Sequence, residues 1–236
     1  MTFKLKASFV FIVALTCAGL SLPAKADTNT YLYIAHAAGG RNVSSTTNPE
    51  FPLDLSIGGV CVAKAVPYGD VLGPYSGPAG SFSVKISPAS IASPCGNAPI
   101  FTLQAGFSAG VSYLGVLTFD ATNTLRLDVV NVDLSAIPAG QGRILVLNSS
   151  AQELSASVSL GTAHTNVNVA AGASVTTNAP AGVYTATITA PGSPTVEAGP
   201  ALVPVSSRDL YIYVLAGSTT NHTVQLFGPK IVHGVF

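Results

Sequence analysis

Tryptophan is absent from the 236 residues of this chain, and charged side chains make up only 8% of them. Ten Lys and Arg residues balance ten Asp and Glu residues, so the formal net charge is zero. No cluster of basic residues is present to neutralise a phosphate backbone, and we therefore expect no binding of nucleic acid. The lack of tryptophan also weakens the case for a carbohydrate-binding sandwich, because such sandwiches usually present a strip of planar rings.

The first 26 residues have the pattern of a secretory signal peptide. Lys4 and Lys6 precede an uncharged run over residues 7–24, and Ala24-Lys25-Ala26 forms a small-residue cleavage site before Asp27. An uncleaved anchor would present the same residues, because the run approaches the length of a membrane-spanning helix. The cleavage site favours removal, which leaves a mature chain with no membrane span. We therefore predict an exported protein, located in the periplasm, at the cell surface or outside the cell.

Cysteine is scarce, and one of the three cysteines lies within the signal peptide. The remaining two, Cys61 and Cys95, belong to a chain that leaves the reducing cytosol, so we expect them to form a disulfide. Closing this loop would stabilise the fold by about 3–4 kcal/mol in the chain-entropy model. The alternative is a pair of free, buried thiols.

Strict alternation of apolar and polar residues recurs along the chain, for example over residues 53–57, 81–87, 154–160 and 184–189. Such alternation is typical of half-buried β-strands, whose solvent faces here carry hydroxyl groups in place of charges. Clusters of Gly, Pro, Asn and Ser separate the segments and indicate turns. After the signal peptide no window has the apolar stripe of a helix, so the sequence predicts an all-β fold.

The chain also repeats itself. Residues 78–86 align with residues 180–188, and residues 113–117 align with residues 211–215. A period of about 100 residues indicates duplication of a domain, since solenoid repeats are shorter. Each copy holds several short strands separated by turn signals, which is typical of an immunoglobulin-like or transthyretin-like antiparallel β-sandwich.

The duplication predicts the following organisation. The signal peptide occupies residues 1–26, the first sandwich domain residues 27–134 and the second sandwich domain residues 143–236. Residues 135–142 have the Gly- and Pro-containing composition of a linker between them.

Four segments of the first copy resemble the domain of unknown function 4397 family: Tyr33-Ile34-Ala35-His36-Ala37, residues 52–59, Val66-Pro67-Tyr68-Gly69 and residues 77–82. Residues 138–148 resemble the junction between tandem copies in that family. The second copy departs from the pattern, because Asn148 replaces a His and Ala156-Ser157-Val158 replaces a Pro-x-Val-Asp motif. The resemblance implies secreted or surface-associated bacterial β-sandwich repeats with no established biochemical activity.

His36 and Asp54 are candidate interaction residues. His36 ends the first expected strand beside a Gly-rich turn, and Asp54 lies near the start of the next. A His and an Asp on neighbouring strands can orient each other as a catalytic pair does. Because no nucleophile accompanies them, we favour the alternative of a hydrogen bond that fixes the strand-to-turn geometry.

Pairs of tyrosines give a second set of candidates. Tyr31 and Tyr33 share one face of their strand, and Tyr211 and Tyr213 share a face of the corresponding strand in the second copy. The rings would form a stripe that contacts a sugar or a peptide, or they would pack in the core of each sandwich. We favour core packing.

No motif for catalysis, a metal or another cofactor stands out. The remaining histidines, His164, His222 and His233, have no ligand at metal-site spacing. We therefore expect an exported, non-enzymatic structural or interaction protein, of the kind found in surface and adhesion proteins. The alternatives are a module that binds a glycan or a peptide and, further off, a hydrolase with an unrecognised site. Self-association is also expected, because edge strands with few charges invite pairing with a second chain.

Export should remove residues 1–26, because Ala24-Lys25-Ala26 meets the small-residue rule of signal cleavage. The intact mass of the exported protein should then correspond to a chain that begins at Asp27. A mass that includes Lys4 and Lys6 would show that the segment is retained as an anchor.

Overall fold

The computed structural model describes residues 28–38, 52–120, 122, 124–152, 154–160, 163–217 and 224–235. The proposed signal peptide lies outside this range. The described residues form sixteen β-strands and no helix, which confirms the all-β class. Within them, no helix has the length and apolar character required to cross a membrane.

Eight strands make up the first half of the molecule: β1 (Asn29–His36), β2 (Leu53–Ile57), β3 (Val60–Val66), β4 (Val71–Pro78), β5 (Gly80–Pro88), β6 (Phe101–Phe107), β7 (Ser112–Phe119) and β8 (Leu125–Val132). They form two four-stranded sheets. We call the sheet with the order β3-β2-β5-β6 outer sheet 1 and the sheet with the order β4-β1-β7-β8 inner sheet 1.

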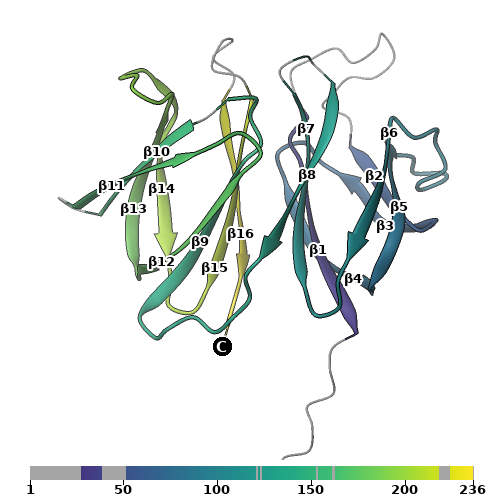
Figure 1. Ribbon diagram of the computed structural model, residues 1–236, viewed down its shortest axis with the longest axis horizontal. Helices are drawn as coiled ribbons and strands as arrows, with labels where there is room; N and C mark the ends of the chain where they lie inside the picture. The colour runs from purple at the N-terminus through teal and green to yellow at the C-terminus, as the bar shows by residue number, and fades with distance from the viewer. Residues whose placement is uncertain are drawn as a thin grey trace, which may run out of the picture.

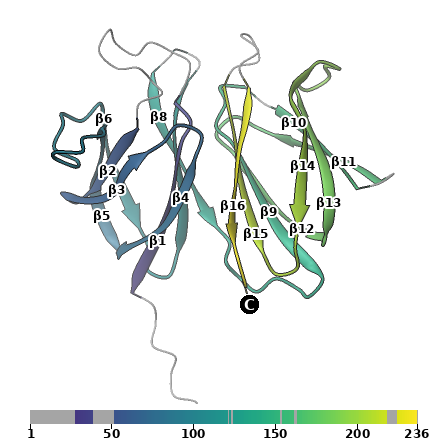
Figure 2. The same ribbon diagram turned by 180° about the vertical axis from the view of Figure 1, so that it is seen from behind.

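Eight further strands make up the second half: β9 (Gln141–Asn148), β10 (Leu154–Leu160), β11 (Ala163–Val169), β12 (Ser174–Pro180), β13 (Gly182–Thr189), β14 (Val196–Val205), β15 (Leu210–Ala216) and β16 (Gln225–Val232). Inner sheet 2 has the order β12-β9-β15-β16 and outer sheet 2 the order β11-β10-β13-β14. The order of the first half is thus repeated strand for strand. Figure 1 shows the four sheets as successive layers, with the inner sheets in the middle, and Figure 2 shows the same layers from behind.

The strand order decides between the two sandwich types that the sequence left open. With the strands of one half lettered A to H, the sheets read D-A-G-H and C-B-E-F. An immunoglobulin sandwich would combine A, B, E and D in one sheet and C, F and G in the other. The observed order therefore differs from that of an immunoglobulin sandwich. Each inner sheet also contains one parallel pair, β1 with β7 and β9 with β15, so the sheets are not antiparallel throughout.

A tyrosine fixes the same corner in both halves. The hydroxyl of Tyr113, near the start of β7, accepts a hydrogen bond from the backbone N–H of Ser108 at 3.0 Å. The hydroxyl of Tyr211, near the start of β15, accepts one from the N–H of Ser206 at 2.8 Å. In each case the tyrosine closes the turn five residues before it, a device related to the tyrosine corner of other sandwiches. The shared bond supports the origin of the two halves by duplication.

Both faces of each inner sheet are buried. On β1, Leu32 and Ile34 pack inside the first sandwich against outer sheet 1, whereas Tyr33 and Ala35 face the second half. Successive side chains of a strand point to opposite faces, so a strand buried on both sides must be apolar at every position. β15 meets this requirement, since all seven residues of its sequence LYIYVLA are buried.

The two inner sheets pack against each other and form a continuous apolar core between the halves. Its members include Tyr33, Leu114 and Val116 from the first half and Leu145, Ile212 and Val214 from the second. The connection between the halves joins this core, because Ile137 is only 3% exposed and belongs to the same cluster. The expected linker over residues 135–142 therefore packs against the inner sheets, and its last two residues belong to β9.

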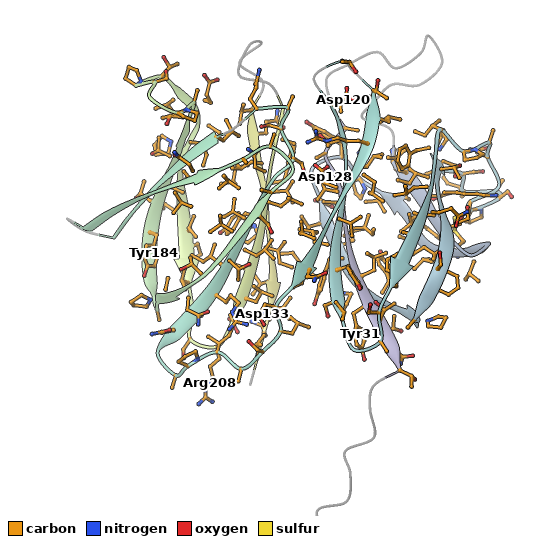
Figure 3. The ribbon with its side chains drawn as sticks, in the orientation of Figure 1. Tyr31, Asp120, Asp128, Asp133, Tyr184 and Arg208 are labelled. Carbon is orange, nitrogen blue, oxygen red and sulfur yellow. A yellow bond between two sulfur atoms is a disulfide. The ribbon has the colours of Figure 1, made fainter. Side chains whose placement is uncertain are left out.

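Two arginines hold the halves together at the ends of this core. Arg126 of β8 donates to the backbone carbonyl of Ser150 at 3.1 Å and forms an ion pair with Asp128, also at 3.1 Å. Arg143 of β9, which is 4% exposed, donates to the carbonyls of Asp133 and Ser135, both at 2.9 Å. Asp128 and Asp133 mark the two ends of the contact in Figure 3. Hydrogen bonds of this charged kind contribute more than neutral ones, typically about 1.5–3 kcal/mol each.

Gly-Pro pairs interrupt three edge strands: Gly73-Pro74 in β4, Gly199-Pro200 in β14 and Gly228-Pro229 in β16. The register of the neighbouring strand shifts opposite each pair, as it does in a β-bulge. Glycine is required there, because a Cβ atom at Gly73, whose φ is +116°, would lie 2.6 Å from the carbonyl oxygen of Leu32. Proline offers no N–H to an incoming strand, so these edges resist pairing although they carry little charge.

The core between the inner sheets predicts that the halves stabilise each other. The intact chain should melt in one transition. Residues 27–134 and 140–236, expressed separately, should each give a β-type circular dichroism spectrum but melt at least about 10 °C lower, since losing about 2 kcal/mol shifts a domain of this size by that amount. Mixing the halves should restore the higher melting temperature. Two independent transitions in the intact chain, matching those of the halves, would contradict this coupling.

Candidate functional site: an apolar groove between β3 and β4

A groove of about 190 Å³ opens in the first sandwich where β3 and β4 diverge. The two strands follow each other in the chain but belong to different sheets, β3 at the edge of outer sheet 1 and β4 at the edge of inner sheet 1. The gap between the sheets is therefore open to solvent along these two edges. Its walls include Val60 and Val62 of β3, and Tyr75 and Pro78 of β4.

Aromatic rings line the inner part of the groove. Phe82 of β5 stacks on Phe107 of β6 with ring centroids 6.4 Å apart, and Phe107 meets Tyr113 edge to face at 5.5 Å. Two glycines make room for Phe82, because a Cβ atom at Gly58 or Gly80 would approach its ring to 3.0 Å. Both glycines have positive φ angles, +58° and +147°, which side-chain-bearing residues rarely adopt. Phe82 is thus held in place by the turn between β2 and β3, which contains Gly58, and by Gly80 at the start of β5.

The residues that line the groove are mostly apolar, and all of them are uncharged. None of its lining residues carries a charge, and the hydroxyl of Thr30 already donates to the carbonyl of Val111 at 3.0 Å. Burial raises the pKa of Tyr75 above its ordinary value, so its phenol stays neutral. Val60 is nevertheless 67% exposed, which leaves a large apolar side chain in water at the rim. Such a site suits a neutral apolar group and offers nothing to hold a phosphate or a carboxylate.

His36 and Asp54, the predicted pair, lie apart from this groove and are both buried, with 2% and 1% exposure. They line a small pocket of about 20 Å³ in the first sandwich. The His36 ring meets the Tyr68 ring edge to face at 5.6 Å, and the His36 carbonyl accepts the N–H of Gly69 at 2.9 Å. Asn148 occupies the same place at the end of β9, where its carbonyl accepts the N–H of Gly172 at 2.7 Å. A His and an Asn at matching strand ends indicate a shared structural position.

Asp54 binds backbone amides from two separate segments. Its Oδ1 accepts the N–H of Ala65 at 2.9 Å, and its Oδ2 accepts those of Ser90 at 3.2 Å and Cys95 at 2.8 Å. Ala65 and Cys95 both have positive φ angles, 49° and 59°, which are uncommon for residues other than glycine. The buried carboxylate therefore holds the end of β3 and the loop after β5 in unusual conformations.

The predicted disulfide is confirmed. Cys61 of β3 is bonded to Cys95 of the loop between β5 and β6, with their Cα atoms 5.7 Å apart. The bond and Asp54 act on the same loop, so both secure the edge strand that forms one wall of the groove.

The tyrosines lie mostly in the cores. Tyr33 is 1% exposed and packs between the halves, and Tyr211 and Tyr213 belong to the core of the second sandwich. Tyr31 is half-buried at the lower end of β1, as labelled in Figure 3. Tyr33 would reach a ligand only if the two halves separated, so the four rings do not form one accessible stripe.

The groove cannot be predicted from the sequence alone. Val60, Tyr75 and Phe82 come from three strands, and nothing in their local patterns distinguishes them from core residues. The one local feature of the sequence that marks the groove is Val60, an apolar residue directly after the Gly58-Gly59 turn. Among the residues that the structure describes, no three His, Cys, Asp or Glu side chains are grouped so as to hold a metal ion.

Comparison with known proteins gives little further information. No family model matches the chain, and no curated protein matches it. A solved structure, "The Bacillus anthracis TIE protein", is similar over 81% of this chain and 34% of that chain, with 10% sequence identity and a TM-score of 0.28. The chain thus spans about a third of the length of that protein.

Replacing Asp54 by Asn should destabilise the protein by about 2–3 kcal/mol, because a buried charged acceptor of three backbone N–H groups becomes a neutral amide. Urea unfolding followed by circular dichroism measures this loss. Asp120→Asn is the matched control, since the Asp120 carboxylate also accepts two backbone N–H groups but is only half-buried. Its loss should be clearly smaller. Equal losses in the two variants would argue against a special role for Asp54.

Proposed function

We propose that this chain is an exported, non-enzymatic interaction protein that binds a segment of a partner polypeptide in the groove between β3 and β4. The observation that carries the proposal is the apolar, uncharged groove with the exposed Val60 side chain at its rim. The volume of about 190 Å³ leaves room for a large apolar side chain. The partner segment would insert such a side chain, aromatic or branched aliphatic, above the Phe82 ring.

The backbone around the groove favours a polypeptide as the occupant. β3 is an edge strand without proline, so its outer side offers N–H and C=O groups to an added strand. β4, on the opposite wall, carries Pro74 and Pro78, which makes it the poorer template. The added strand would therefore pair with β3, and its alternate side chains would point into the groove.

A glycan is the weaker alternative for this site. Sugar hydroxyl groups need several hydrogen-bonding partners, but Thr30 and Ser76 are the main polar side chains beside the groove, together with the Tyr75 hydroxyl. Catalysis is also not part of the proposal, because His36 and Asp54 are buried away from the groove.

The proposed setting is the outside of a bacterial cell or its periplasm. The signal-peptide pattern and the resemblance to the domain of unknown function 4397 family support this setting, and the Cys61–Cys95 bond agrees with an oxidising compartment. Two sandwiches coupled through a common core would present the groove on a rigid body, which suits an adhesive or scaffolding role.

Selection of peptides from a random library displayed on phage tests the proposal. Peptides enriched on the mature protein should contain alternating apolar residues with an aromatic or branched aliphatic anchor. Binding of the enriched peptides, measured by calorimetry, should weaken at least tenfold in Val60→Lys, because a charge would then stand at the rim of the groove.

Val183→Lys is the matched control, because Val183 is a similarly exposed valine, at 59%, on a strand of the second half. This variant should bind the peptides as tightly as the unmodified protein. Both substitutions change exposed positions, so both variants should keep the melting temperature within a few degrees. The proposal fails if no peptide is enriched, or if Val60→Lys and Val183→Lys bind the peptides equally well.

A further inference from the structure

The hydroxyl of Tyr75 is an unused polar group in the groove between β3 and β4. Tyr75 belongs to β4, pairs with Leu32 of β1, and packs its half-buried ring against the core of the first sandwich. Its hydroxyl forms no hydrogen bond within the described part of the chain. Unlike the hydroxyl of Tyr213, which is unpaired and cut off from solvent, that of Tyr75 remains accessible. A molecule that enters the groove can therefore reach it.

The other hydroxyl groups of the groove have less to offer a ligand. That of Thr30 already donates to the carbonyl of Val111 at 3.0 Å, and Ser76 is exposed to water. Filling the groove would displace water from the Tyr75 hydroxyl. An anchor made only of carbon and hydrogen would leave this hydroxyl without a partner, which is unfavourable, whereas an anchor with its own hydroxyl would restore the bond.

The size and lining of the groove suit an aromatic ring that carries one hydroxyl. An apolar cavity of about 150 Å³ holds a benzene molecule. The groove, at about 190 Å³, therefore has room for a ring with a few further atoms. The rings of Phe82 and Phe107 line it and can pack against an aromatic anchor. Because no lining residue is charged, a carboxylate or an ammonium group would lose its hydration without gaining an ion pair.

The available hydroxyl distinguishes this groove from the matching place in the second half. Thr177 of β12 occupies the position of Tyr75 and is exposed. Tyr184 occupies the position of Phe82, and its hydroxyl donates to the carbonyl of Pro180 at 2.7 Å. The phenol at this place in the second half is thus bonded within its own sandwich, whereas the phenol in the first half is available to a ligand. The requirements of the shared fold therefore do not account for Tyr75.

We propose that the partner segment inserts a tyrosine side chain into the groove, and that its hydroxyl forms a hydrogen bond with the hydroxyl of Tyr75. This inference rests on the proposed function, because it specifies which anchor the groove selects. Burial raises the pKa of Tyr75, so its phenol keeps its proton and can either donate or accept the bond. A site with such a group discriminates against an analogue that lacks the hydroxyl, here phenylalanine.

Two analogues of the anchor side chain are suitable probes: 4-methylphenol for tyrosine and toluene for phenylalanine. Each is titrated into the mature protein with labelled valine methyl groups, and the NMR signals of Val60 and Val62 report on the groove. 4-Methylphenol should bind more tightly than toluene. A groove that offered only apolar contacts would show the opposite preference, because removing a hydroxyl from water without a partner is unfavourable.

Tyr75→Phe removes only the hydroxyl, and it should reverse the preference between the two probes. The binding of 4-methylphenol should weaken about tenfold, since one hydrogen bond contributes about that factor, and toluene should bind at least as tightly as before. The melting temperature of this variant without ligand should stay unchanged, because the hydroxyl has no bond within the described chain to lose.

Tyr184→Phe is the matched control in the second sandwich. Its hydroxyl donates to the carbonyl of Pro180, so this variant should melt lower than the unmodified protein. It should keep the preference for 4-methylphenol, because Tyr184 does not line the groove.

Three results would overturn the inference. The first is that toluene binds the unmodified protein as tightly as 4-methylphenol or more tightly. The second is that Tyr75→Phe binds 4-methylphenol with unchanged affinity. The third is that 4-methylphenol at millimolar concentration leaves the Val60 and Val62 signals unshifted. The proposed function is judged separately by the peptide library: enriched peptides anchored by residues other than tyrosine would support peptide binding and still contradict the role of Tyr75.

Discussion

The apolar contact between the two inner sheets is the constraint on which the rest of the structure depends. A sheet in an ordinary two-layer sandwich buries one face, whereas each inner sheet here buries two. The strands at the centre of these sheets must therefore be apolar at nearly every position. The polar residues that join the two halves lie at the ends of the contact. Arg126 and Arg143 occupy such end positions, where they bind backbone carbonyls across the contact or along the connection between the halves. The halves are thus joined by packing and by charged hydrogen bonds, with the connecting segment folded into the same core.

This arrangement leaves the outer sheets and the open edges as the places where a partner can bind. Low charge would normally leave such edges prone to aggregation, because Lys and Glu side chains usually prevent an exposed strand from pairing with another chain. In this protein Gly-Pro bulges take over that role on β4, β14 and β16. β3 has no proline, and the Cys61–Cys95 bond and Asp54 hold it in place. β3, an edge strand without proline, is therefore fastened to the rest of its sheet.

Duplication explains how the two halves share one architecture and still differ in detail. The features needed for folding recur in both halves, namely the strand order, the parallel central pair and the tyrosine that closes the turn before β7 or β15. The two halves differ at an edge strand and at a central strand. The disulfide fastens the edge strand β3 of the first half, and Tyr213 of the central strand β15 stands where the first half has Gly115 on β7.

The sequence by itself determined the all-β class, the repeat and the Cys61–Cys95 pair, because alternation, turn residues and cysteine count are local or compositional signals. Alternation indicates that one face of a strand is buried, but not which segment covers it. The sequence therefore predicts that Tyr33 packs in a core, but not that this core lies between the two halves. The residues of the groove come together only through strand order, since β3 and β4 are chain neighbours that lie in different sheets. Which strands become edges depends on pairings between segments far apart in the chain, such as β1 with β7. The tertiary structure alone decided those pairings, and with them the surfaces that are open to a partner.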